Sequence, residues 1–137
     1  MTWRSSTRVV AAAVAALSGL GYLSNISSFH ACEARAATAL VAAVGERNVY
    51  QRTHRPSVRG SVLSAAGFVV RECPPSQVNG VCFPWIELAP AQSVLPFVSS
   101  VRWGAADGPL AGAGGTTRFL CVFGWVVDLG DHRVWVS

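Results

Sequence analysis

Lysine is absent from this 137-residue chain, and charged residues of any kind are few. All 11 basic residues are arginine, and charged side chains make up 13% of the sequence, against about 25% in an average soluble domain. Hydrophobic residues make up 51%, so the composition excludes an intrinsically disordered chain. GC-rich coding sequence accounts for arginine in place of lysine, and a membrane segment would account for the shortage of charge.

The sequence also lacks the short motifs of common catalytic and nucleotide-binding sites. It contains no P-loop, no GxSxG and no HExxH, and no CxxC pair for zinc or redox chemistry. The arginines are spread from Arg4 to Arg133 without a recognition motif, so nucleic acid is not an expected partner. We therefore expect a protein that is not an enzyme and that needs no cofactor.

Two groups of residues near the C-terminus represent the catalytic and metal-binding alternatives. Cys121 and His132 supply the thiol and the base that a thiol-dependent enzyme needs. A buried core position explains Cys121 more simply, because free cysteine is among the most buried residue types. Asp128, Asp131 and His132 offer metal-ligand atoms, but they lie where a hairpin turn is expected, so no metal site is predicted.

The strongest signal is an uncharged N-terminal run. Arg4 and Arg8 precede it, and the 21 residues from Val9 to Phe29 carry no charge. At about 1.5 Å per helical residue, this run can cross a hydrocarbon core roughly 30 Å thick. We expect residues 1–8 in the cytoplasm, a signal-anchor helix through the membrane over residues 9–29, and the remainder outside, because basic residues stay on the cytoplasmic side.

The same segment also permits a cleavable signal peptide and hence a secreted domain. Val9–Leu23 has the length of a signal-peptide core, and Ala34-Arg35-Ala36 places small residues before a cleavage point. That point lies far beyond the apolar run, and cleavage would leave an odd number of cysteines, so an uncleaved anchor is favoured. Asn25-Ile26-Ser27 matches a glycosylation acceptor but lies inside the apolar run, so we set it aside.

Composition divides the exported remainder into three segments. Residues 30–52 are Ala-rich and proline-free, which predicts a helical stalk that ends near Gly45. Residues 53–60 are polar and predict a linker. Residues 61–137 carry β-branched and aromatic runs broken by prolines, which predicts roughly four to six short strands. The expected fold is a small mostly-β domain with a C-terminal hairpin, preceded by the hydrophobic helix and the stalk.

The clearest strand is predicted over residues 116–129. Apolar side chains fall on both of its faces, which favours a central strand covered on both sides. Residues 104–115 are rich in glycine and alanine, which predicts a mobile loop. The chain is expected to turn at residues 130–133 into a last short strand.

The cysteines supply the first candidate sites. Cys73 and Cys82 flank Asn79-Gly80, a dipeptide that favours a tight hairpin turn. Thiols pair in an exported compartment, so a disulfide between Cys73 and Cys82 is predicted. Cys32 and Cys121 are the candidates for a second disulfide.

Tryptophan supplies the candidate interaction sites, because it is a favoured anchor in protein interfaces. We expect Trp85, Trp103 and Trp135 to contact another membrane or envelope protein. The favoured function is therefore a single-pass membrane or envelope protein with a non-catalytic interaction or structural domain. The alternatives are a secreted disulfide-stabilised domain, a reading frame without selected function, and a thiol-dependent enzyme.

Reduction is expected to destabilise the exported domain. A bond between Cys73 and Cys82 closes a short loop, for which chain-entropy models give roughly 2–3 kcal/mol, out of the ~5 kcal/mol typical of a small domain. Thermal unfolding should therefore occur at a lower temperature with reductant than without it. Non-reducing peptide mapping checks the pairing, because separately alkylated Cys73 and Cys82 peptides from unreduced protein would contradict it.

Overall fold

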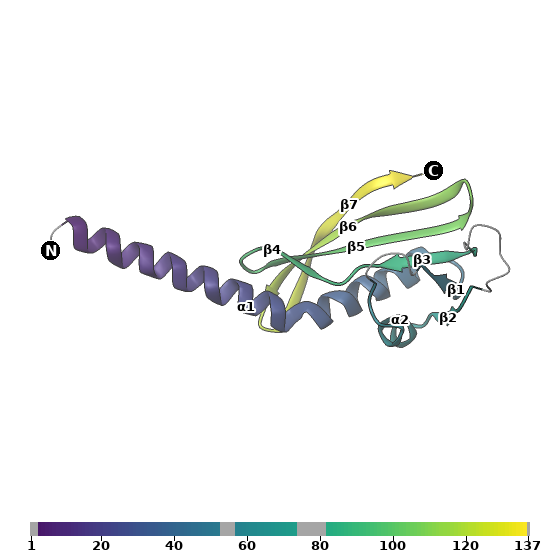
Figure 1. Ribbon diagram of the computed structural model, residues 1–137, viewed down its shortest axis with the longest axis horizontal. Coiled ribbons are helices and arrows are strands. Elements are labelled where there is room, and N and C mark those ends of the chain that lie inside the picture. The colour runs from purple at the N-terminus through teal and green to yellow at the C-terminus, as the bar shows by residue number, and fades with distance from the viewer. Residues whose placement is uncertain (1–2, 53–56, 74–81, 137) are drawn as a thin grey trace.

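The computed structural model describes residues 3–52, 57–73 and 82–136. It contains a long helix, α1 (Trp3–Ala43), a short helix, α2 (Gly60–Ala66), and one sheet (Figure 1). The strands are β1 (Asn48–Gln51), β2 (Val69–Arg71), β3 (Trp85–Leu88), β4 (Gln92–Leu95), β5 (Val98–Gly108), β6 (Ala111–Val122) and β7 (Trp125–Val136).

The sheet is mixed. Its strand order is β2-β1-β3-β5-β6-β7, and β4 pairs with the beginning of β5. β1 runs parallel to β2 and β3, whereas the pairs from β3 to β7 are antiparallel. Helix and strand take comparable shares of the described chain, so the predicted mostly-β class fits the fold only roughly.

α1 is continuous from the expected anchor into the domain. Its Ala-rich, proline-free sequence favours helix, and it ends at Ala43, close to the predicted stop at Gly45. Its C-terminal half is not a separate stalk, because Cys32, Ala37 and Leu40 are buried in the core. Its N-terminal half projects alone beyond the sheet (Figure 1). The sheet also begins before the predicted linker, since β1 ends at Gln51.

The core lies between α1, α2 and one face of the sheet. Residues alternate along β5 and β6, so that Val101, Phe119 and Cys121 are buried toward α1. Small side chains such as Ala36 and Ala37 let the helix lie close to the strands. Further buried residues come from β1, β3, β7 and the surroundings of α2: Val49, Val58, Leu63, Phe68, Ile86, Leu88 and Val126.

The prediction of a mobile loop over residues 104–115 is wrong. These residues form the end of β5 and the beginning of β6, which are paired from Gly104 with Gly114 to Gly108 with Ala111, with a register shift between Ala106 and Gly108. Gly104 faces the ring of Trp85, and a Cβ atom there would lie 3.3 Å from a ring carbon. The small residues of β5 therefore make room for a large neighbour, which composition alone does not distinguish from a loop.

The predicted strand that is covered on both sides is also wrong. β6 ends at Val122, and the chain reverses at Phe123 and Gly124, whose φ angles are 43° and 93°. Two successive positive φ values are typical of a tight two-residue hairpin. The C-terminal hairpin is therefore formed here, and the expected turn at Gly130 lies inside β7. β6 buries the face of Cys121 and exposes the face of Val122.

Gly21 is the point where α1 first packs closely against the sheet, so it tests this contact. A Cβ atom on Gly21 would overlap Pro96 and lie 2.9 Å from a ring carbon of Phe97, whereas one on Gly19 would meet nothing within 4 Å. Gly21→Ala should lower the free energy of unfolding by about 1–3 kcal/mol. Gly19→Ala, the control, should gain up to about 1 kcal/mol from helix propensity. Thermal unfolding in detergent, followed by near-UV circular dichroism, compares them; equal stability would contradict the close contact.

Candidate functional site

Polar side chains within the apolar run hold the domain onto α1. Ser24, Asn25 and Ser28 are each 0% exposed, although the run around them is apolar. Their spacing of one and four residues places them on one side of the helix. A buried polar group costs free energy unless it is hydrogen-bonded. The hydroxyls of Ser24 and Ser28 and Asn25 Nδ2 are bonded to a β-turn, whereas Asn25 Oδ1 has no partner among the described residues. We call Gly21, Ser24, Asn25 and Ser28 the clasp.

Two serines of the clasp bind the turn between β6 and β7. Ser24 Oγ accepts a hydrogen bond from the backbone N–H of Phe123 at 2.7 Å and donates one to the carbonyl of Cys121 at 2.9 Å. Ser28 Oγ accepts a hydrogen bond from the N–H of Gly124 at 2.8 Å. The helix therefore provides hydrogen-bond partners for backbone groups of this turn, in which Phe123 has a positive φ angle.

The other two clasp residues bind the turn between β4 and β5. Asn25 Nδ2 donates hydrogen bonds to the carbonyls of Leu95, at 2.7 Å, and Val98, at 3.1 Å. The carbonyl of Gly21 accepts a hydrogen bond from the N–H of Phe97 at 3.2 Å, and Phe97 has a φ of 63°. Both turns are thus fixed beside the same part of α1.

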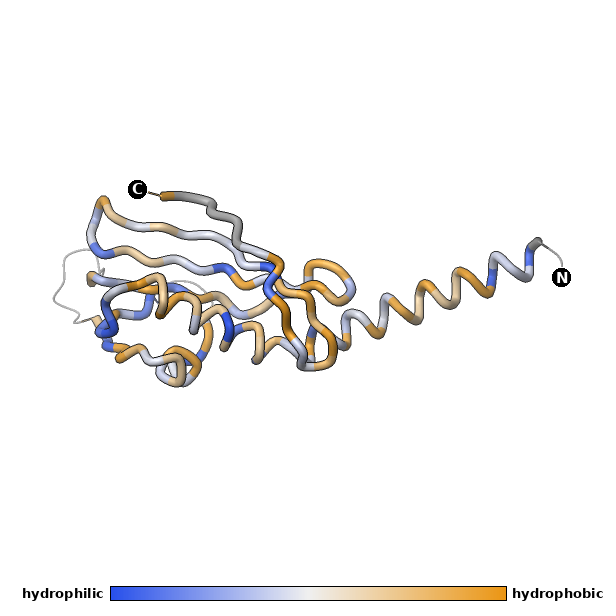
Figure 2. Tube along the Cα trace, turned by 180° about the vertical axis from the view of Figure 1, so that it is seen from behind, coloured by the Kyte–Doolittle hydropathy of each residue, from blue (hydrophilic) through white to orange (hydrophobic). Residues whose placement is uncertain are grey.

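An exposed apolar surface surrounds the clasp. On α1 the exposed side chains are Tyr22, Leu23 and Ile26, and on the two turns they are Leu95, Phe123 and Trp125. We call these six residues the collar. Figure 2 shows the hydrophobic colouring of the two turns and of the projecting helix.

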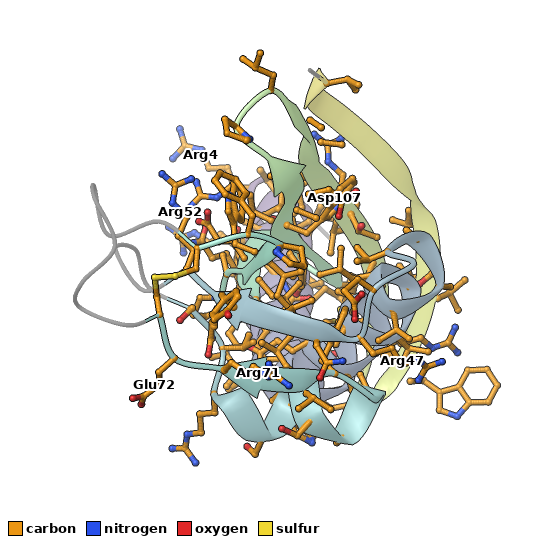
Figure 3. All side chains as sticks on the ribbon, turned by 90° about the vertical axis from the view of Figure 1, so that its right-hand side faces the viewer. Arg4, Arg47, Arg52, Arg71, Glu72 and Asp107 are labelled. Carbon is orange, nitrogen blue, oxygen red and sulfur yellow. A yellow bond between two sulfur atoms is a disulfide. The ribbon has the colours of Figure 1, made fainter. Side chains whose placement is uncertain are left out.

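Charged side chains lie at the opposite end of the domain. Figure 3 views that end and shows Arg47, Arg52, Arg71, Glu72 and Asp107 around its periphery. The disulfide, drawn there as a yellow bond, also lies at that end. Exposed apolar side chains therefore gather where α1 leaves the domain, while the far end carries these charged groups together with exposed Leu110 and Val136.

Of the three tryptophans expected at a partner interface, the two whose side chains are described lie outside the collar. Trp85 is buried, with the guanidinium carbon of Arg52 4.9 Å from its ring centroid. Trp103 is half-buried against the core, and the side chain of Trp135 lies outside the described part of the chain. Among the tryptophan side chains that the structure describes, Trp125 is the exposed one, at 78%. Sequence reasoning had assigned it to a covered strand face.

The predicted disulfide is present. Cys73 and Cys82 are bonded, and their Cα atoms are 5.6 Å apart, within the usual range for a disulfide. Residues 74–81 between them, including the expected Asn79-Gly80 turn, lie outside the described residues.

Cys32 and Cys121 meet in the core as free thiols. Their sulfur atoms are 3.5 Å apart, and both residues are 0% exposed. Burial, followed by the hydrogen bond with Cys121, raises the pKa of the Cys32 thiol to about 12. Such a thiol stays protonated at neutral pH and is a poor nucleophile. The two residues are together as expected, and the second disulfide stays a prediction.

The other candidate groups are possible metal ligands and a buried carboxylate. No set of three or more His, Cys, Asp and Glu side chains in the described chain could hold a metal ion, and those of Asp131 and His132 lie outside the description. Glu87 is buried, and one of its carboxylate oxygens has no hydrogen-bond partner among the described residues. A pocket of about 320 Å³ between the end of α1 and the β5–β6 hairpin is lined by apolar and small residues together with Asp107.

Comparison of the chain with protein-family models, with curated proteins and with solved structures gave no match. Its function must therefore be inferred from geometry, and the distinctive geometry is the clasp with its collar. Sequence reasoning missed the clasp because Ser24, Asn25 and Ser28 were counted only as members of the uncharged run over residues 9–29. Their helical spacing was the available signal, since it places the polar atoms on one side of α1.

Ser24 and Ser27 form a matched pair for testing the clasp. Ser24→Ala removes the acceptor of the Phe123 N–H and the donor to Cys121, which should cost about 1–3 kcal/mol. The hydroxyl of Ser27 bonds only the carbonyl of Ser24 in its own helix, and Ser27 is exposed, so Ser27→Ala should change stability by less than about 0.5 kcal/mol. Hydrogen exchange of a peptide containing Phe123 should accelerate in the first variant only; equal exchange in both would contradict the clasp.

Proposed function

We propose that the protein is a single-pass membrane or envelope protein whose domain, outside the cytoplasm, is a non-catalytic structural or interaction module. The supporting observation is the projecting half of α1. Its most apolar window is only 17% buried, and Val9, Val14 and Leu17 are 58–62% exposed. A helix that is apolar on all sides belongs in a protein core or a bilayer, and this half has no core around it.

The direction of insertion follows from charge and redox chemistry. Arg4 and Arg8 precede the apolar run, and basic residues are retained on the cytoplasmic side. The domain would then lie in an oxidising compartment, where the bond between Cys73 and Cys82 persists. A signal sequence can have the same length and hydropathy as a membrane-spanning helix. The secreted alternative therefore depends on which parts of the domain cleavage would remove.

Cleavage after Ala36 would remove most of the helix on which the sheet packs. The whole clasp would be lost, and so would Cys32 and Ala36 of the core. Only the last two turns of α1 would remain, without the hydrogen bonds that hold both β-turns. An uncleaved anchor is therefore the better proposal.

A non-catalytic role is supported by the chemistry of the buried groups. The Cys32 thiol has a pKa of about 12 and cannot supply a thiolate at neutral pH.

The proposed protein partner is another membrane or envelope protein, and the surface proposed for it is the edge strand β7. β7 is 12 residues long and ends the strand order of the described sheet. It exposes Leu129 and Val136. An open apolar edge strand is a template for pairing with another chain.

Fractionation tests the anchor. The full-length chain should remain in membranes during alkaline carbonate extraction and be released by detergent. Val14→Arg, in the projecting helix, should reduce membrane recovery because a central arginine costs about 2.5–3.5 kcal/mol on insertion. Val69→Arg, at an exposed position on β2, is the control and should not. Recovery of full-length chain in the soluble cytosol, or a mature protein beginning at Ala37, would contradict the proposal.

A further inference from the structure

The free part of α1 is too short to cross a bilayer by itself. Arg8 is the last charged residue before the apolar run, and Gly21 is where the helix meets Pro96 of the domain. The residues between them, 9–20, span about 18 Å of helix. The hydrocarbon core of a typical bilayer is about 30 Å thick. A domain held clear of the lipid would leave roughly 12 Å of that core without a helix that is free to cross it.

The uncharged run does continue, but through the clasp. Residues 21–29 add about 13 Å of helix, enough to complete the span. In this stretch one side of α1 binds the two β-turns, and the other exposes Tyr22, Leu23 and Ile26. If the span is completed here, both turns are carried to the outer boundary of the hydrocarbon core.

The turns have the side chains that such a position requires. Leu95 is 58% exposed, Phe123 59% and Trp125 78%, and aromatic residues are enriched at membrane interfaces. Phe123 has a positive φ, a costly conformation for a bulky residue that often marks functional turns. Exposing these apolar side chains to water costs free energy, whereas a lipid interface would bury them.

On the outer face of the sheet, apolar side chains near the two turns are followed by charged side chains farther away. Leu95, Val98, Leu120 and Val127 lie opposite one another across four neighbouring strands, and Leu120 and Val127 are exposed. The next exposed side chains away from this end, on the same face of β6 and β5, are Arg118 and Arg102.

Apolar groups followed by arginines match the change from acyl chains to phosphate groups, because arginine extends its charge toward the interface. Two acidic residues lie on β7 near this end: Asp128, which is exposed, and Asp131, whose side chain lies outside the description.

We infer that the collar inserts into the outer leaflet of the lipid bilayer and seats the domain directly on the membrane. This inference rests on the proposed anchoring by α1. The domain then has a fixed orientation, with its charged end and its disulfide away from the lipid. Arg118 and Arg102 face the headgroups, so anionic phospholipid strengthens the contact.

Environment-sensitive fluorophores on single introduced cysteines test this arrangement in the full chain. The labelled variants are Phe123→Cys in the collar, Val14→Cys in the projecting helix, and Leu110→Cys at the β5–β6 turn. Leu110 is 86% exposed and lies at the far end of the domain, so it is the matched control. Each protein is reconstituted in vesicles of phosphatidylcholine and phosphatidylglycerol that carry nitroxide-labelled acyl chains. The native cysteines are bonded or buried.

Fluorescence at positions 123 and 14 should be quenched by the nitroxide lipid, with emission shifted to shorter wavelength, while position 110 should show neither change. If Phe123→Cys does not fold, Trp125→Cys provides the same reading. Quenching at 14 with none at 123 or 125 would overturn the collar and leave the anchor intact. No quenching at any position would overturn both. An emission shift at position 123 that disappears when excess lipid dilutes the protein would instead assign the collar to contact with a second copy of the chain.

Discussion

The hydrogen bonds between α1 and the two β-turns determine how the rest of the molecule is arranged. Ser24, Asn25 and Ser28 lie inside an otherwise apolar helix, where polar atoms without partners would be costly. The turns supply partners for the hydroxyls of Ser24 and Ser28 and for Asn25 Nδ2, whereas Asn25 Oδ1 has none among the described residues. In return the serines bind the backbone of the turn at Phe123, whose φ is positive. Helix and sheet therefore depend on one another. Without the turns the helix has unpaired buried groups, and without the helix the turns lose the contacts that offset their backbone strain.

The same helical segment meets two environments. One side of residues 21–28 is polar and small and faces the protein, while Tyr22, Leu23 and Ile26 on the other sides are exposed and apolar. This division lets an uncharged run begin as a free helix and end as the core helix of a domain without a linker between them. The domain is consequently joined to the projecting half of α1 by continuous helix, and its own apolar end adjoins that half.

Stabilising interactions are distributed along the domain, from the end where α1 projects to the opposite end. The clasp closes the end of the domain from which α1 projects, and the bond between Cys73 and Cys82 closes the far, charged end (Figure 3). Between them lies the core, in which the thiols of Cys32 and Cys121 connect α1 with β6 at 3.5 Å. The disulfide and the clasp are remote from each other, so their contributions to stability should be nearly additive.

The sequence by itself determined the features that local chemistry decides. Alanine content and the absence of proline predicted α1 and its end near Gly45, and the pair Cys73 and Cys82 predicted the disulfide. Tertiary packing decided the rest. Gly104 was expected in a loop, but in the structure the ring of Trp85 lies against it. Trp125 was expected on a covered face of a strand, but the chain reverses at Phe123 and leaves Trp125 exposed. Ser24 was expected only as part of an uncharged membrane run, but a turn almost 100 residues later in the sequence binds its hydroxyl. In each case the deciding partner is distant in the chain, and local propensity carries no information about such a partner.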